Sequence, residues 1–338
     1  VAMTGTRIDA HCFIPDVLKA GTRILVTERP IDMELEACEL DEEEKKKITI
    51  LRVKDSRRAL ALLSAARFGY PAKKLTLIGV TGTKGKTTTT HMIKTVLEAA
   101  GKKAGLIGTT GVVIGEHVTP TMNTTPESYE LHKAFAQMAE AGCDYAVMEV
   151  SSQGVKMHRV DGILFDYGIF TNISPDHIGP DEHKDFEEYY KTRLLDSCRI
   201  GLLNGADPHA EAIKKEVSCK LYTYNAGKES KVPDDFMAEN IRYLAEPDFV
   251  GTQFHVSGRC EMEIRLGIPG LFNVENAMAA VSLCSLLGLD PQRVSHALEH
   301  IRVNGRMEIV HTSSHCTVLV DYAHNAVSME SLLKTLRD

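Results

Sequence analysis

The sequence lacks cysteine pairs at CxxC spacing, long hydrophobic runs and a signal-peptide pattern at its start. Its eight cysteines are spread over 338 residues, which excludes zinc ribbons and dithiol redox motifs because both need that short spacing. Such isolated cysteines are typical of buried thiols in a reduced compartment. The longest apolar stretches, such as Leu75–Val80, are far shorter than the roughly 20 residues that cross a bilayer. We therefore expect a cytoplasmic protein with no membrane partner.

An excess of basic residues is also missing, since Lys and Arg number 39 against 46 Asp and Glu, a net charge of −7. No positive field is available to bind a nucleic-acid backbone, so we expect no nucleic-acid partner. Glycine and proline, at 25 and 12 residues, are too few for collagen-like or disordered chains. The length allows a little over two domains at roughly 150 residues each. We expect a globular protein, and a monomer.

From residue 75 onward, short apolar runs alternate with helical periodicity. The runs that predict strands are Leu75–Val80, Ala104–Thr109, Tyr145–Val150, Tyr167–Asn172 and Ile200–Asn204. The segments Thr87–Ala100, Ser128–Ala141 and Val274–Leu287 have helical spacing. This alternation indicates βαβ units around a parallel sheet that is buried on both faces, an α/β fold. In Phe249–Pro269, apolar and polar residues alternate about a turn at Gly258, which predicts a small antiparallel appendage.

The strongest local motif runs from Gly79 to Thr88, GVTGTKGKTT, between a predicted strand and a predicted helix. Glycines allow backbone N–H groups to converge on phosphate oxygens, and the helix N-terminus adds partial positive charge. Lys86 would neutralise the β- and γ-phosphates, and Thr87 would reach a Mg²⁺ ion. The motif departs from GxxxxGK[ST], because Val80 occupies the position of the first glycine. The segment nevertheless predicts an ATP-binding loop.

With this loop, six further segments resemble motifs of the Mur ligase family, the ATP-dependent amide-bond ligases of peptidoglycan assembly. The loop match is Gly82, Thr83, Lys84, Gly85, Lys86, Thr87 and Thr88, and the others are NTTP at 123–126, MEVSS at 148–152, TNISPDH at 171–177, FNVENA at 272–277, GRME at 305–308 and VDYAH at 320–324. They occur in the family's order. Residues 9–14, DAHCFI, are weakly similar to a segment of the family's N-terminal substrate domain. The NTTP segment and the pattern of Val318–Leu336 most resemble the branch of the family that adds the third residue of the peptide.

The resemblance implies three parts. Residues 1–72 would be a partial N-terminal domain for the UDP-sugar peptide, and residues 73–304 the central ATPase domain with the phosphate loop. Residues 305–338 would be the beginning of a Rossmann-like C-terminal domain that binds the amino acid. We expect the first and last parts to be truncated, because both chain ends look cut. The implied substrates are ATP, UDP-N-acetylmuramoyl-dipeptide and a free amino acid, with diaminopimelate and lysine as the leading candidates. ATP would phosphorylate the peptide's carboxylate, and the amine would attack the acyl phosphate.

The resemblance also assigns roles to residues outside the loop. Glu149, at the end of a predicted strand next to the loop, would bind Mg²⁺, and His177 a second metal ion. Asn276, Arg306 and Asp321 would hold adenine, ribose and phosphate. The residues implied for the UDP-sugar peptide are Asn123, Thr124, Thr125, Ser151 and Arg159. Arg159 would clamp a carboxylate or the acyl phosphate.

One position departs from the family's pattern. The family has a carbamylated lysine four residues after a tyrosine, and here the residue four after Tyr189 is Arg193. Arginine cannot be carbamylated in this way and stays cationic. We hypothesise that Arg193 replaces part of the second Mg²⁺ electrostatically. Two alternatives stay open: a folylpolyglutamate or cyanophycin-type ligase, and a nucleotide-binding paralogue with altered catalysis.

Overall fold

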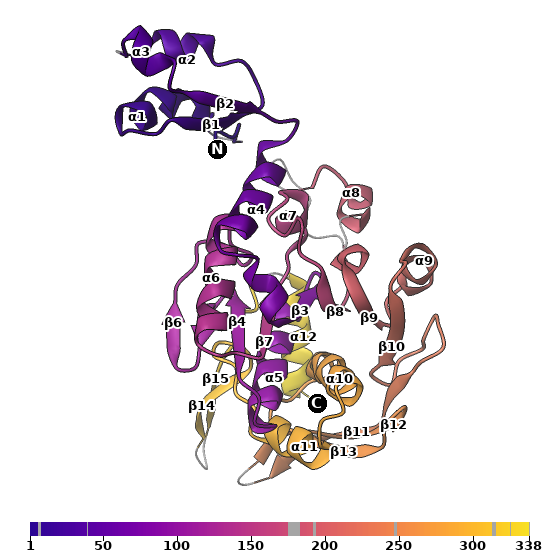
Figure 1. Ribbon diagram of the computed structural model, residues 1–338. Helices are drawn as coiled ribbons and strands as arrows, with labels where there is room; N and C mark the ends of the chain where they lie inside the picture. Colours follow the sequence, from indigo (N-terminus) through magenta and orange to yellow (C-terminus); the bar gives the residue numbers. More distant parts are fainter. Residues whose placement is uncertain are drawn as a thin grey trace.

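One long, mostly parallel sheet forms the centre of the protein in this computed structural model, which describes residues 1–5, 8–38, 40–174, 183–191, 194–246, 249–312, 316–324 and 326–337. Within these residues the sheet has eleven strands, in the order β13-β12-β11-β10-β9-β8-β3-β7-β4-β5-β6 (Figure 1). Its parallel strands are β3 (Thr76–Thr81), β4 (Ala104–Gly108), β7 (Tyr145–Glu149), β8 (Phe165–Phe170), β9 (Cys198–Asn204) and β10 (Lys220–Asn225). The predicted α/β fold is confirmed.

Antiparallel strands extend the sheet on both sides. Beyond β4 lie β5 (Gly111–Ile114) and β6 (His117–Thr119), and beyond β10 lie β11 (Phe236–Glu246), β12 (Phe249–Gly258) and β13 (Met262–Leu266). The β11 strand joins β10 through a short parallel pairing, Tyr224 with Phe236 and Asn225 with Met237. The predicted antiparallel segment is therefore present, and it continues the central sheet.

Helices cover both faces of the sheet, as its residue pattern requires. The α5 (Lys86–Ala99), α10 (Leu271–Leu286) and α11 (Pro291–Glu299) helices share one buried cluster with Ile78 and Val80 of β3. On the other face, α6 (Ser128–Glu140), α9 (Ala210–Glu216) and the 3-10 helix η3 (Leu194–Ser197) share a second cluster with Leu77 of β3. Successive residues of β3 point into the two clusters on opposite faces of the sheet, so both faces of the strand are buried. This explains why the strand is apolar throughout.

A smaller body precedes the sheet, drawn in indigo in Figure 1. It pairs β1 (Ile24–Thr27) with β2 (Thr49–Arg52) and has its own apolar cluster around Ile14 and Leu25. Its helices are η1 (Ala10–Phe13), α1 (Ile14–Lys19), α2 (Asp32–Glu36) and α3 (Glu42–Lys45). The α4 helix (Ser56–Arg67), which packs against α6, and η2 (Pro71–Lys74) lead from it to the central sheet.

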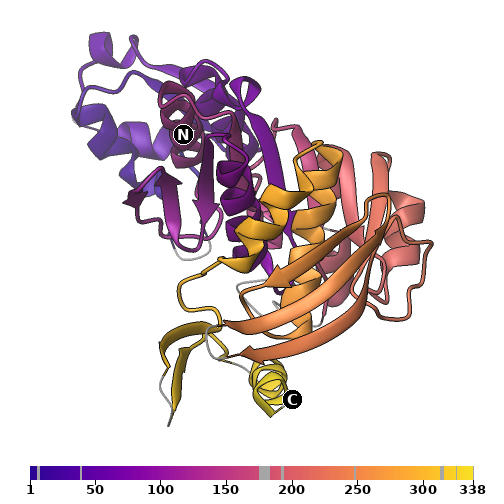
Figure 2. The same ribbon diagram turned by 90° about the horizontal axis from the view of Figure 1, so that it is seen from below.

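The last described residues form a hairpin and a helix. The β14 strand (Glu308–Thr312) pairs antiparallel with β15 (Thr317–Val320), and α12 (Ala326–Arg337) follows. Figure 2 shows this helix, in yellow, beside the antiparallel strands. Its Thr335 lies near Gly270, at the start of α10. No helix among the described residues is long and apolar enough to span a membrane.

Candidate functional site

The phosphate loop, Gly82–Thr88, turns sharply between β3 and α5. Gly82 has φ +137° and Gly85 φ +88°, conformations that side chains rarely adopt. A Cβ atom on Gly82 would lie 2.1 Å from Oγ1 of Thr171, and one on Gly85 would lie 2.2 Å from Oδ1 of Asn276. Both positions therefore require glycine for the turn and for the close approach of neighbouring chains.

The segment after β8 holds the phosphate loop in place. In the loop, the Thr83 N–H donates to the backbone oxygen of Asn172 and the Lys84 N–H donates to its side-chain oxygen, each at 2.9 Å. In return, the Lys84 carbonyl accepts two hydrogen bonds, one from the Thr171 hydroxyl at 2.7 Å and one from the Asn172 side-chain amide at 3.1 Å. Ser174 N–H donates to Oγ1 of Thr83 at 3.0 Å. The loop is thus fixed by residues about ninety positions further along the chain.

Lys86 reaches back across the loop from the start of α5. Its ammonium donates to the carbonyl oxygens of Gly82, at 2.7 Å, and Thr83, at 3.2 Å. The lysine thus places its charge at the mouth of the loop, where the helix N-terminus also carries partial positive charge. A glycine turn, a lysine and a helix N-terminus together form an anion site of the kind that binds phosphate groups.

Glu149 is the last residue of β7, beside the loop, and it lies opposite Val80 in the parallel pairing of β7 with β3. Its side chain is 1% exposed. One carboxylate oxygen accepts a hydrogen bond from the Thr87 hydroxyl at 3.0 Å, and the other accepts one from the Thr109 N–H at 2.8 Å. A buried carboxylate next to a hydroxyl is an oxygen-donor set that suits Mg²⁺. The structure therefore brings together Thr87 and Glu149, the two residues predicted to share a metal ion.

The predicted substrate residues 123–126, named here the threonine segment, meet β7 at the same place. The buried Thr125 hydroxyl donates to the Glu149 carbonyl at 3.0 Å and accepts from the Ser151 N–H at 2.9 Å. Thr124 is bonded more lightly, through a 3.0 Å contact between its hydroxyl and that of Thr109. Asn123 is exposed. The base of the segment is fixed while its tip faces solvent.

Arg159 lies against the threonine segment. Its guanidinium donates to the Thr125 carbonyl at 3.0 Å and pairs with Glu127 at 2.7 Å. Ser151 caps α7 (Ser152–Lys156) by accepting the Gly154 N–H at 3.0 Å. Both predicted substrate residues thus also have structural partners here.

Of the three residues predicted for adenine, ribose and phosphate, Asn276 lies beside the loop. Its Oδ1 accepts the Thr89 hydroxyl at 3.3 Å, in addition to the approach to Gly85 described above. Arg306 stacks over the ring of Tyr322 with 4.6 Å between the guanidinium carbon and the ring centroid. Asp321 accepts the N–H groups of Met307 and Ala323, both at 2.8 Å. These contacts thus join the residues just before β14 to the residues just after β15.

Two predicted catalytic residues, His177 and Arg193, lie outside the described residues. Sequence reasoning missed a group of polar residues close to them in the chain. His183 is fully buried, and its Nε2 lies 2.9 Å from the Ser152 hydroxyl. Lys156 donates to Glu188 at 2.9 Å, and this bond, with one from the Lys184 N–H, lowers the pKa of Glu188 to about 2. These bonds connect α7 to α8 (Phe186–Lys191). No motif in the sequence signals this pairing.

Comparison with known families places the chain among ligases. The Mur ligase middle domain matches residues 80–284, and the Mur ligase glutamate ligase domain matches residues 305–338. A UDP-N-acetylmuramoyl-L-alanyl-D-glutamate--2,6-diaminopimelate ligase of Clostridium perfringens (strain 13 / Type A) is 36% identical over 346 residues, covering 100% of this chain and 67% of the relative. The enzyme of the same name from Clostridium tetani (strain Massachusetts / E88) is 39% identical over 343 residues, with the same coverage. The chain spans about two thirds of the length of these relatives.

Solved structures share the fold. A UDP-N-acetylmuramoyl-L-alanyl-D-glutamate--2,6-diaminopimelate ligase superposes with a TM-score of 0.79 at 24% identity, over 97% of this chain and 64% of that one. The Mycobacterium tuberculosis folylpolyglutamate synthase complexed with ADP and AMPPCP has a TM-score of 0.65 at 20% identity, over 83% of this chain and 70% of that one.

Proposed function

This chain belongs to the Mur ligase family, whose members form amide bonds at the expense of ATP, and we propose that it adds an amino acid to UDP-N-acetylmuramoyl-L-alanyl-D-glutamate in peptidoglycan biosynthesis. Diaminopimelate is the first candidate for that amino acid, because the curated relatives are named for it; lysine is the second. The observation that carries the proposal is the meeting of phosphate loop, Glu149 and threonine segment at one edge of the sheet.

The chain's residues support a phosphoryl transfer at this edge. The N-terminus of α5, with Lys86, binds and orients the phosphates of ATP. Thr87 and Glu149 would hold Mg²⁺, which neutralises charge that develops on the transferring phosphoryl group. The burial of Glu149 and its short bonds keep the carboxylate oriented toward the loop. The peptide's carboxylate takes the γ-phosphoryl group of ATP, and ADP leaves. The amine of the incoming amino acid then attacks the acyl phosphate, and the amide bond forms as phosphate leaves and the amine loses a proton.

The remaining assignments rest on the sequence and on proximity. Asn123, Thr124, Thr125, Ser151 and Arg159 are proposed to bind the UDP-sugar peptide, supported by the convergence of their segments at the end of β7. Asn276 is proposed for adenine, supported by its place beside Gly85. The motifs alone support the roles proposed for the last three residues. These are ribose and phosphate binding for Arg306 and Asp321, and binding of a second metal ion for His177.

The proposed domains are 1–72, 73–304 and 305–338, supported by the separate two-stranded sheets before and after the central one. A cytoplasmic monomer remains our proposal for the location and oligomeric state.

Phosphate release from ATP tests the proposed reaction, with the complete gene product, UDP-N-acetylmuramoyl-dipeptide and a panel of amino acids. We expect release to need the dipeptide and to be fastest with diaminopimelate. Tight ATP binding without release for any amino acid would instead support a nucleotide-binding paralogue. Release with a pterin or polyaspartate acceptor alone would support a folylpolyglutamate or cyanophycin-type ligase.

Arg193 is proposed to take over part of the charge of a second metal ion, on the basis of its position four residues after Tyr189. The Arg193→Lys variant should then need more Mg²⁺ for half-maximal turnover and should respond to bicarbonate, because a lysine can be carbamylated. Unchanged turnover and Mg²⁺ titration, with no bicarbonate effect, contradict the role.

A further inference from the structure

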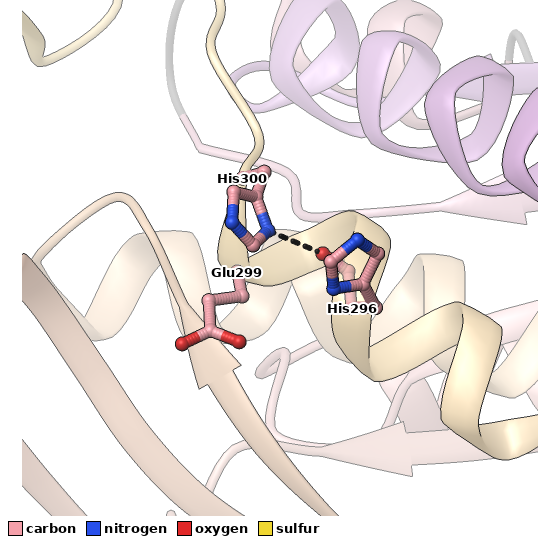
Figure 3. Close-up of side chains that lie close together, drawn as sticks. All are labelled: His296, Glu299 and His300. Carbon is pink, nitrogen blue, oxygen red and sulfur yellow. Dashed lines mark hydrogen bonds between the residues drawn. The ribbon is translucent and has the colours of Figure 1, made fainter.

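The last turn of α11 gathers two histidines and a carboxylate on the protein surface. The potential ligand atoms of His296, Glu299 and His300 all lie within 4.8 Å of one another, and both histidines are exposed (Figure 3). His300 caps the helix four residues after His296, and the two ring centroids are 4.5 Å apart. Helical spacing of four places side chains on the same face, an arrangement that lets two histidines share one metal ion.

A hydrogen bond within the turn presets one of the two rings. Nδ1 of His300 lies 3.0 Å from the carbonyl oxygen of His296. A carbonyl oxygen can only accept, so Nδ1 carries the proton, and in the neutral ring Nε2 keeps its lone pair. Metal-binding histidines are commonly oriented in this way, with the second nitrogen donating to a backbone carbonyl. This hydrogen bond therefore leaves Nε2 as the nitrogen of His300 that can bind a metal ion.

The backbone below the cluster is fixed by the end of β13. Gly267 N–H donates to the Leu298 carbonyl at 3.0 Å. A Cβ atom on Gly267 would lie only 2.3 Å from the Glu299 carbonyl oxygen, so helix and strand approach as closely as glycine allows. One turn earlier, the Ser295 hydroxyl donates to the Glu263 carbonyl at 2.9 Å. Because these contacts already fix the end of the helix, less conformational entropy is lost when a metal ion binds.

Electrostatics at the cluster favour a cation. The C-terminal end of a helix carries partial negative charge, and Glu299 adds a carboxylate. Glu299 pairs with Arg265 at 3.3 Å, but Arg265 also pairs with Glu246 at 2.9 Å. Arg265 thus keeps an acidic partner when Glu299 turns to a metal ion.

We propose that His296, Glu299 and His300 form a binding site for a divalent transition-metal ion of the zinc class. Two imidazoles and one carboxylate are ligands that Zn²⁺ prefers, whereas Mg²⁺ prefers an all-oxygen set such as that of Thr87 and Glu149. Water completes the coordination. The ion would fasten the last turn of α11 at the point where the chain continues toward β14. The site is independent of the proposed ligase reaction.

Zn²⁺ titration of the purified chain, in excess Mg²⁺ and with thiols kept reduced, tests the site. We expect one Zn²⁺ equivalent whose affinity falls at least about tenfold in His296→Gln and in His300→Gln. Co²⁺ used in place of Zn²⁺ should give the visible absorption of a nitrogen and oxygen site that both variants lose. It should lack the thiolate-to-cobalt band that exposed cysteines such as Cys12 and Cys316 would produce.

His255→Gln is the matched control. His255 is also a surface histidine among carboxylates, but its Nδ1 lies 2.8 Å from Glu263 and its Nε2 2.8 Å from Glu261, so both nitrogens are engaged. This variant should bind Zn²⁺ like the parent chain. The proposal is overturned if the α11 variants bind within about twofold of the parent, if the control loses the same equivalent, or if excess Mg²⁺ displaces the ion.

Discussion

The phosphate loop and the threonine segment meet at one residue, Glu149, yet they are built differently. Glu149 contacts the first through its carboxylate, which accepts the Thr87 hydroxyl, and the second through its carbonyl, which accepts the Thr125 hydroxyl. In the phosphate loop, glycines with positive φ and bonds to the segment after β8 leave every residue at least partly buried. In the threonine segment, Thr125 is fully buried, whereas Asn123 and the preceding Met122 are exposed.

This difference indicates which part of the site is formed before ligands arrive. A loop whose backbone is already fixed by its neighbours needs little reorganisation on binding, which favours affinity. An exposed tip on a fixed base can instead adjust to a bulky sugar peptide. We infer a rigid nucleotide side and an adaptable peptide side.

The largest effect is expected where the two regions meet, in Glu149→Gln. The amide keeps an oxygen for the Thr109 N–H but removes the charge proposed to hold Mg²⁺. Phosphate release should slow by roughly 10²–10³-fold with little change in thermal stability. Initial rates across a Mg²⁺ titration measure this. Glu98→Gln, which breaks the exposed ion pair with Lys94 on α5, should keep the parent rate, and equal rates for both variants would refute the role of Glu149.

Gly85→Ala tests the rigidity of the nucleotide side. The added Cβ meets Asn276 at 2.2 Å and forces a side chain into φ +88°. We expect ATP affinity to fall about 100-fold, since strain of this kind costs about 1–3 kcal/mol before the clash is added. Calorimetric titration with ATP gives the value. Gly101→Ala is the control, because Gly101 has φ +79° but nothing within 4 Å of the added atom; it should bind ATP normally.

Two neighbouring threonines test the contrast between base and tip. Thr125→Ala removes the buried hydroxyl that accepts the Ser151 N–H, so the free energy of unfolding should fall by roughly 1–3 kcal/mol. Thr124→Ala removes a single contact to Thr109, and should cost less than about 0.5 kcal/mol. Urea unfolding of both variants measures the difference. Thr125→Ser keeps the hydroxyl and should recover most of the loss; equal costs for the two alanine variants would contradict the contrast.

The smallest effect concerns pH, on the α6 helix that follows the threonine segment. Burial lowers the pKa of His132 to about 4, from about 6.5 in an unfolded chain. The unfolded chain binds the proton first, so stability present above about pH 6.5 is lost as the pH falls toward 4. His132→Leu should reduce the loss between pH 7 and pH 5 by about 1–2 kcal/mol. Burial also lowers the pKa of His91 to about 4, and His91 contributes equally in the parent protein and in the variant. Urea unfolding at several pH values measures the free energy of unfolding of both proteins. The same dependence on pH in both would rule out the contribution of His132.

Local patterns in the sequence predict much of the central sheet. The strands β3, β4, β7 and β9 and the helices α5, α6 and α10 lie within three residues of their predicted bounds, because each has a strong apolar period. The β11 strand was missed. Six of its eleven residues are exposed and only two are buried, so it has no continuous apolar run. Its pairing with β10 and β12 is set by tertiary contacts.

Short motifs predict site residues such as Gly82, Lys86, Thr87 and Glu149, and the structure brings these residues together. The residues that support them carry no such motif signal. Thr171 and Asn172 hold the phosphate loop across almost ninety residues, and His183 and Glu188 connect α8 to α7 without any spacing that signals it. Such contacts depend on which strands become neighbours, which composition and periodicity do not specify.

The bond between Thr89 and Asn276 joins positions 187 apart in the sequence. On a ribosome that adds about 5–20 residues per second, Thr89 therefore emerges roughly ten seconds or more before Asn276. Until then the nascent chain has the phosphate-binding sequence without this support. Nucleotide binding that depends on Asn276 would then begin only after synthesis has passed α10.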